Sequence, residues 1–362
     1  MRVTTSTPGR ICLFGEHLDY LGLPVIAAAI SRRIAITAES DQTPSVRLDL
    51  PDLGGRVEFS ISEQPLAYAD TRDYFRSAIN VLLREGYTFG RGLSGTVRGN
   101  IPINSGTSSS SALLVSWLNL LTHLADVPRP LARASLAELA YAAEVLEFGE
   151  PGGMMDHYAT AVGQVIYLES IPAIHLRSLS PPLGTFVLGD SGEPKDTIGI
   201  LSRVKLGMLA IDRRLRALDP TFSLHTAELT QATEFKDILS KPDYRLLKGT
   251  LANRDLLRQA LPLLDGTLPL DHARFGQLLT EHQANLRDAQ GISTPKIDRM
   301  VQAALDAGAL GGKINGSGGG GCMFAYAPTD PERVAAAIER EGGRAYVITV
   351  ADGTTATEEP VL

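Results

Sequence analysis

Apolar residues recur at helical spacing in several stretches of the chain. Leu113, Trp117, Leu120 and Leu124 repeat every three or four positions, which predicts a mostly buried helix over residues 110–127. A similar pattern predicts a helix over residues 136–148 and a long, charged helical region from 197 to about 258. Three further amphipathic helices are predicted over residues 271–289, 293–309 and 331–341.

Other segments have the short, β-branched character of strands. Residues 22–39 are apolar with a turn-like centre, which predicts a hairpin; strands are also predicted over 96–104, 164–170, 184–190, 322–327 and 344–350. Strands and helices therefore alternate, which indicates α+β or α/β layers rather than a helical bundle. The length of 362 residues suits two domains, and Pro181-Pro182 predicts a boundary that separates residues 1–180 from 181–362.

Composition narrows the classes of function. The net charge is -7 and aromatic residues make up 6%, so a nucleic-acid-binding module is not expected. Cys12 and Cys322 are the only cysteines, which predicts neither a disulfide framework nor a Cys/His metal site. The first residues lack the apolar core of a signal peptide, and no apolar run is long enough to span a membrane. We expect a cytoplasmic protein without a membrane or nucleic-acid partner.

Four consecutive serines, Ser108 to Ser111, lead into the first predicted helix. The start of a helix has unpaired backbone N–H groups and a dipole that favours anions, and small residues let phosphate oxygens approach closely. A hydroxyl there can also bind a metal ion carried by the phosphates. The segment lacks the GxxxxGK[ST] pattern, so a serine N-cap with spare serines is the alternative. The predicted nucleotide-phosphate loop comprises Asn104, Ser105, Gly106, Thr107, Ser108, Ser109, Ser110 and Ser111.

Ionisable residues crowd the otherwise apolar segment PGRICLFGEHLDYLG near the start of the chain. Burying Arg10, Glu16, His17 and Asp19 together is unfavourable unless they are paired or functional. Two carboxylates and an imidazole suit the hydrogen bonding of several hydroxyls, as on a sugar. The alternative is a surface turn with incidental charges.

A third segment, GEPGGMMDHYATAVG, places Asp156 after a Pro-Gly-Gly turn and two methionines. An aspartate in such apolar surroundings needs a partner, and Arg10 is the natural candidate. The alternative is that Asp156 caps a helix beginning at His157. A fourth segment, GGKINGSGGGGCMF, has glycines that permit close approach of another chain or a ligand just before a strand.

Taken in order, these segments resemble the three motifs of the GHMP kinase superfamily, the small-molecule kinases of galactose, homoserine, mevalonate and phosphomevalonate. The resemblance covers essentially the whole chain. It implies an α+β, two-domain fold, with an N-terminal ribosomal-protein-S5-like α/β domain and a C-terminal ferredoxin-like α+β domain. It also implies ATP and Mg²⁺ as cofactors, with the ATP phosphates over the serine loop.

Within the superfamily the chain is most similar to the galactokinase group, because GEHLDYLG matches its first motif and AAEVLEFGEPGGMMDH resembles its segment ending in PCGIMDQ. The resemblance implies roles for particular residues. Asp156 and Arg10 would be catalytic. Glu16, His17, Asp19 and Gly153 would bind the sugar. Ser110 and Glu144 would bind Mg²⁺, with Ser109 as the alternative to Ser110 if the alignment shifts.

The chain also departs from the galactokinase pattern. Asn104 and Ser105 stand where glycines are usual, and Leu21-Gly22-Leu23 replaces a glycine pair. The segment VLGDSGEPKDTIG has no tyrosine that aligns with the sugar-contacting one; Asp190, Lys195 and Thr197 are closer to mevalonate kinases. These changes preserve phosphoryl transfer and put galactose itself in doubt.

The sequence therefore predicts an ATP-dependent kinase that phosphorylates the anomeric hydroxyl of a galactose-like monosaccharide, as a monomer or small homo-oligomer. Two alternatives remain. One is a GHMP kinase for mevalonate, a different sugar or a polyol. The other is a catalytically silent, kinase-fold sensor.

Overall fold

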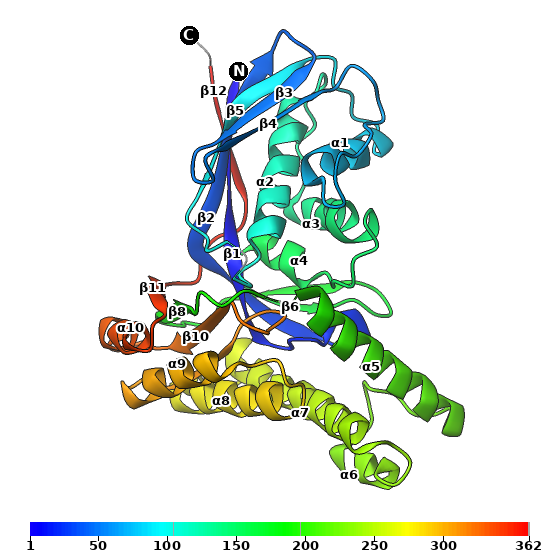
Figure 1. The fold of residues 1–362 in the computed structure, drawn as a ribbon, viewed down its shortest axis with the longest axis vertical. Helices are drawn as coiled ribbons and strands as arrows, with labels where there is room; N and C mark the ends of the chain where they lie inside the picture. The colour runs from blue at the N-terminus through cyan, green and yellow to red at the C-terminus, as the bar shows by residue number, and fades with distance from the viewer. Residues whose placement is uncertain (104, 196, 361–362) are drawn as a thin grey trace.

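The structure, a computed structural model, describes residues 1–103, 105–195 and 197–360, without the side chains of 197 and 198. Its described strands form an eight-stranded and a four-stranded sheet (Figure 1). The larger sheet has the order β12-β1-β2-β5-β3-β4, with β6 paired to β2 and β7 to β6. Its strands are β1 (Arg2–Phe14), β2 (Val25–Asp41), β3 (Ser45–Leu50), β4 (Gly55–Ser60), β5 (Gly92–Gly99), β6 (Val165–Glu169), β7 (His175–Leu179) and β12 (Thr355–Glu359).

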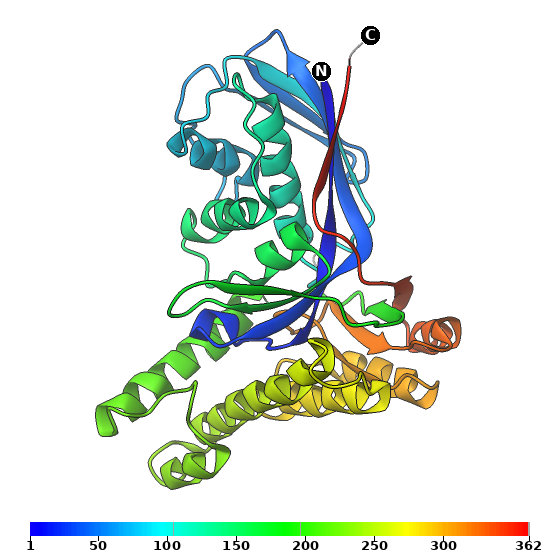
Figure 2. The same ribbon diagram turned by 180° about the vertical axis from the view of Figure 1, so that it is seen from behind.

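The smaller sheet has the strand order β11-β8-β10-β9. Its strands are β8 (Phe186–Asp190), β9 (Gly311–Ile314), β10 (Cys322–Tyr326) and β11 (Arg344–Ile348). Helices pack against both sheets, so the predicted α+β layers are confirmed (Figures 1 and 2).

Helices of the first half of the chain cover one face of the larger sheet, with α2 against β1 and β2 (Figure 1). They are α1 (Tyr74–Arg84), α2 (Ser109–Leu124), α3 (Arg133–Tyr141), the π-helical turn η2 (Ala142–Leu146) and α4 (Met155–Val162). Near the smaller sheet lie α7 (Lys241–Leu264), α8 (His272–Asp288), α9 (Pro295–Asp306) and α10 (Pro331–Arg340). The helix α5 (Thr197–Leu218) projects from the body of the molecule, and the short α6 (Leu229–Ala232) lies at the end of α7 (Figure 2).

Strand β1 joins the two halves of the molecule because its second part is buried on both faces. Cys12 packs in the core beneath α2, whereas Ile11 and Leu13 pack in a core shared with α7 and α8. A polar side chain on this part of β1 is therefore buried. Arg10 occupies such a position, and it is only 3% exposed.

The predicted hairpin over residues 22–39 is wrong, because β2 is a single strand that follows β1 along its length. The pairing shifts at one point: Pro8 faces Arg33, but Arg10 faces Ala29. This bulge accommodates the polar residues that resembled a turn. The predicted helix over 136–148 also changes character, because α3 ends at Tyr141 and continues as the π-helical turn η2.

The change from one sheet to the other falls between β7 and β8, on either side of Pro181-Pro182. The last strand does not follow this division, because β12 returns to pair with β1. Both ends of the chain consequently lie together at one end of the molecule (Figures 1 and 2). Residues 355–359 thus hydrogen-bond within the larger sheet, and the boundary at Pro181-Pro182 stays a prediction.

Candidate active site

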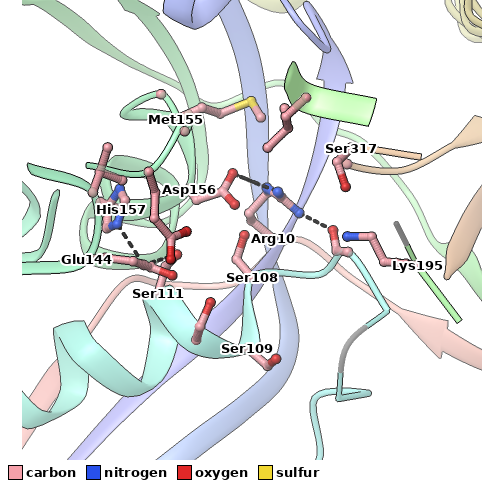
Figure 3. Close-up of a pocket in the computed structure, with 18 of the residues that line it drawn as sticks. Arg10, Ser108, Ser109, Ser111, Glu144, Met155, Asp156, His157, Lys195 and Ser317 are labelled. Atoms are coloured by element: carbon pink, nitrogen blue, oxygen red, sulfur yellow. Dashed lines mark hydrogen bonds and ion pairs between the residues drawn. The ribbon is translucent and has the colours of Figure 1, made fainter. Parts of the chain in front are cut away.

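A cavity of about 850 Å³ opens where β1, the start of α2, η2, α4 and the loop after β8 meet. Figure 3 shows how side chains from these elements converge on it. Of the residues predicted from the sequence, the cavity lining includes Arg10, Glu16, His17, Asp19, Gly106, Ser108, Ser109, Ser110, Ser111, Glu144, Gly153 and Asp156. Asn104, also predicted, lies outside the described residues.

Arg10 and Asp156 form the predicted ion pair at the centre of the cavity (Figure 3). The Arg10 Nε donates to Asp156 Oδ1 at 2.8 Å, and Nη2 lies 2.6 Å from the same oxygen. Burial acts to raise the pKa of Asp156, but the Arg10 charge and the Ser108 hydroxyl outweigh it and hold that pKa below its usual value. The carboxylate is therefore ionised at neutral pH. Its interpretation as a helix cap is wrong, because Asp156 lies inside the first turn of α4 and faces Arg10.

The first part of the serine loop is bound to both sheets through its backbone. Thr107 O accepts from the backbone N–H of Arg10 at 3.1 Å, and Ser105 O accepts from that of Cys322 at 2.7 Å. The Ser105 hydroxyl donates to Pro102 O at 2.8 Å and lies 3.0 Å from the Thr107 hydroxyl. These two buried hydroxyls thus stabilise the loop itself, and the later serines line the cavity.

The serine run does not act as a side-chain cap for α2. Ser108 occupies the N-cap position with a left-handed φ of 59°, and its side chain makes no capping hydrogen bond. Ser108 to Ser111 all line the cavity at the helix start, where backbone N–H groups and the helix dipole favour an anion. The serine N-cap alternative is therefore wrong, and the phosphate loop stays a prediction.

Glu144 lies beside the serines and has the donor chemistry of a Mg²⁺ ligand. Its Oε2 accepts from the Ser111 hydroxyl at 2.8 Å and lies 2.8 Å from His157 Nε2. Burial acts to raise the pKa of Glu144, but these two partners and Ser110 bring it below its usual value. Among the described residues no three His, Cys, Asp or Glu side chains group into a metal site. Mg²⁺ commonly binds proteins through one or two carboxylates together with substrate phosphates and water, so its binding by Ser110 and Glu144 stays a prediction.

Asp19 begins the short 3₁₀ helix η1 (Asp19–Leu21) on the other side of the cavity. Its Oδ1 accepts from the Tyr20 N–H at 2.9 Å and its Oδ2 from the Met155 N–H at 3.3 Å. Burial and the neighbouring Asp156 raise the pKa of Asp19. Gly153 makes room for this carboxylate, because a Cβ there would lie 1.9 Å from Asp19 Oδ2. The predicted contribution of Gly153 therefore has a steric basis.

His17 is neutral and already hydrogen-bonded within the protein. Its Nδ1 lies 2.8 Å from the Tyr20 hydroxyl and its Nε2 lies 3.1 Å from Ser317 O, so Nε2 carries the proton and Nδ1 accepts. Burial lowers the pKa of His17 to about 4. Glu16 pairs with the fully buried Lys313, while its Oε2 has no hydrogen-bond partner among the described residues. Contact of Glu16 and His17 with an acceptor stays a prediction.

Comparison with known proteins decides the family. Models of the family match three segments: the GHMP kinases N terminal domain over residues 73–164, the GHMP kinases C terminal domain over 258–345 and the galactokinase galactose-binding signature over 2–39. A mevalonate kinase of Thermococcus onnurineus is 30% identical over 99% of both chains. A galactokinase of Thermococcus kodakarensis is 30% identical over 88% of this chain and 87% of that one. The chain belongs to the GHMP kinase family.

Solved structures agree with the two-domain fold predicted for a GHMP kinase. Galactokinase of Lactococcus lactis, solved in complex with galactose, has a TM-score of 0.85 at 23% identity, covering 98% of this chain and 95% of that one. Mevalonate kinase of Methanococcus jannaschii has a TM-score of 0.74 at 19% identity, covering 96% and 98%. The described helices include none that is long and apolar enough to cross a membrane.

Sequence reasoning missed three residues that shape the site of this GHMP kinase. His157 holds the Glu144 carboxylate, although thirteen residues separate them in the chain. Asn315 bridges two motifs: its Oδ1 accepts from the Cys12 N–H at 2.9 Å, and its Nδ2 donates to Gly106 O at 2.8 Å. Lys313 neutralises Glu16 from the same glycine-rich segment. In the sequence, Lys313 and Asn315 are marked only by their position inside the glycine-rich segment GGKINGSGGGGCMF.

Proposed function

We propose that this GHMP kinase transfers the γ-phosphoryl group of ATP to the anomeric hydroxyl of a galactose-like monosaccharide. The observation that carries the proposal is the placement of the Arg10–Asp156 pair between two sets of groups. Arg10 donates to Gly106 O in the serine loop, and the Asp19 carboxylate accepts from the N–H of Met155, the neighbour of Asp156. An acceptor hydroxyl and a terminal phosphate can meet at such a junction.

The residues on either side of the junction have complementary tasks. The acceptor oxygen forms a bond to the γ-phosphorus, the bond from that phosphorus to the β,γ-bridging oxygen breaks, and ADP leaves. Asp156 orients the hydroxyl and receives its proton, weakly, because Arg10 keeps its pKa low. Arg10 also stabilises the charge that spreads over the phosphoryl oxygens. Mg²⁺, when held by Ser110 and Glu144, would neutralise phosphate charge.

Two observations favour a galactose-like acceptor. The galactokinase galactose-binding signature matches residues 2–39, the segment that contains Asp19. Asp19 keeps a carboxylate at the cavity beside Asp156, and a carboxylate accepts hydrogen bonds from neighbouring hydroxyls of a sugar. In addition, the absence of a side chain at Gly153 leaves space for this carboxylate.

Mevalonate is the second candidate acceptor, because the Thermococcus onnurineus relative is a mevalonate kinase aligned over nearly the whole chain. Lys195 in the loop after β8 also favours it. Arg10 and Asp19 argue for a sugar instead, since the sequence resemblance associates these two residues with galactokinases. A silent sensor is disfavoured, because Arg10, Glu144 and Asp156 are all retained around one cavity.

Release of ADP across a panel of acceptors tests the proposal. The panel contains free hexoses, pentoses, uronic acids, amino sugars and mevalonate, and NMR of the product locates the phosphate. We expect turnover with a galactose-like hexose and phosphate on O1. Turnover with mevalonate alone would replace the sugar proposal, and absence of acceptor-dependent turnover with tight ATP binding would favour the sensor.

A further inference from the structure

The loop that follows β8 is fastened to the glycine-rich turn before β10. The Ser191 N–H donates to Gly321 O at 2.9 Å, and the Gly321 N–H donates to Glu193 O at 3.1 Å. The Glu193 carboxylate accepts from the Thr294 hydroxyl at 2.5 Å. Lys195, two residues further along, therefore extends from an anchored backbone into the cavity.

The side chain of Lys195 packs against Gly321, and its Nζ lies beside Gly106 of the serine loop. A Cβ on Gly321 would lie 2.8 Å from Lys195 Cδ, and a Cβ on Gly106 would lie 3.2 Å from its Nζ. Gly106 O is also the acceptor of the Arg10 guanidinium. Asp156, Arg10 and Lys195 consequently lie in a row across the cavity, with Ser108 beside them (Figure 3).

The ammonium of Lys195 has a charge environment that suits an anion. No carboxylate among the described residues forms an ion pair with it, and Asp156 is already paired with Arg10. Burial lowers the pKa of Lys195 to about 8, and the Arg10 charge acts in the same direction. Two neighbouring cations in a partly buried site repel each other, and an anion placed between them removes that repulsion.

We propose that Lys195 contacts the terminal phosphates of the nucleotide and acts with Arg10 as a second cation on the transferred phosphoryl group. The inference rests on the proposed function, because it requires the phosphates to lie on the serine loop. Charge in phosphoryl transfer spreads over three equatorial oxygens, so cations approaching from two directions stabilise it better than one. Its position beside Gly106 assigns Lys195 to the phosphate rather than to the acceptor. The lysine on which the Asp19 charge acts is Lys205.

Binding of nucleotides to Lys195→Met tests this assignment. Titration calorimetry with the Mg²⁺ complex of AMPPNP, and separately with AMP, reports the phosphate contact without needing the acceptor. We expect Lys195→Met to bind AMPPNP about 10-fold more weakly and AMP as well as wild type, because AMP lacks the terminal phosphates. Its kcat should fall roughly 100-fold, while Lys195→Arg should retain most of the AMPPNP affinity.

Lys205→Met is the matched control, since it removes the same charge on the acceptor side, where Lys205 Nζ donates to Pro151 O at 3.1 Å. It should leave AMPPNP affinity unchanged. Wild-type AMPPNP affinity in Lys195→Met, or a rise confined to the acceptor KM, overturns the role of Lys195 and leaves the kinase proposal intact. Failure of the wild-type protein itself to bind AMPPNP overturns the kinase proposal and the role of Lys195 together.

Discussion

The two sides of the cavity are built in different ways. The proposed phosphate side, residues 105–111 with the turn 316–321, is held by main-chain hydrogen bonds to β1 and β10 and by the Asn315 bridge. The proposed acceptor side, residues 16–20 with Gly153, depends on side chains: the His17–Tyr20 contact, the Glu16–Lys313 pair and the space that Gly153 leaves for Asp19.

This difference explains why the comparisons identify the family but match kinases that are named for two different acceptors. Backbone groups and small residues can hold a phosphate whatever the acceptor is. A relative named as a mevalonate kinase and one named as a galactokinase are both 30% identical to this chain. We therefore expect specificity to come from side chains on the proposed acceptor side.

Asp156→Asn is expected to have the largest effect, because it removes the charge where the two sides meet. Turnover should fall roughly 10²- to 10⁴-fold with AMPPNP binding nearly unchanged, as measured by ADP release and calorimetry. Asp190→Asn is the control, since Asp190 also lines the cavity but bonds to the Gly192 N–H. Near-normal turnover of folded Asp156→Asn would remove this residue from the mechanism.

Gly153→Ala separates the acceptor side from the phosphate side. The new Cβ would displace the Asp19 carboxylate, and loss of a charged hydrogen bond of about 2–3 kcal/mol should raise the acceptor KM roughly 30- to 150-fold. Gly152→Ala is the matched control, because its Cβ meets only Val145 Cγ2, at 3.2 Å. Equal acceptor KM values for the two variants, or loss of AMPPNP affinity in Gly153→Ala, would contradict this division.

The pH dependence of the unfolding free energy of His17→Asn tests whether His17 is buried and neutral. The folded pKa of about 4 lies below the ordinary value of 6.5, so the unfolded chain binds more protons between these values. The stability associated with neutral His17 is therefore present above pH 6.5 and is lost as pH falls towards 4. From pH 7 to pH 5, wild type should lose about 2 kcal/mol more unfolding free energy than His17→Asn, measured with urea. His175→Asn, at an exposed position, should follow wild type; parallel losses in all three proteins would refute the buried neutral imidazole.

His157→Ala should have the smallest effect, confined to the metal on the phosphate side. His157 orients Glu144, and loss of such a supporting partner typically weakens metal affinity at least 10-fold. The Mg²⁺ concentration for half-maximal AMPPNP binding should rise about 10-fold, and His157→Gln, which keeps an N–H donor, should recover part of it. An unchanged Mg²⁺ requirement would show that Glu144 needs no such partner.

Several features of the molecule could be predicted from the sequence because they are local. The helix after the serines follows from its apolar spacing, and the Arg10–Asp156 pair follows from the need of a buried carboxylate for a cation. The hairpin over 22–39 failed for a non-local reason. Its turn-like centre is absorbed by a bulge against β1, and residue patterns alone contain no record of that pairing.

The sequence by itself determined the family motifs, the candidate phosphate loop and the candidate aspartate, since each depends on residue types within a short segment. Only the tertiary structure placed His157 on Glu144, Lys313 on Glu16 and Lys195 beside Gly106. It also returned the end of the chain to the larger sheet as β12. The Lys313 and Lys195 contacts join segments far apart in the chain, and they form because a core shared by β1, α7, α8 and β10 packs the two halves of the chain together.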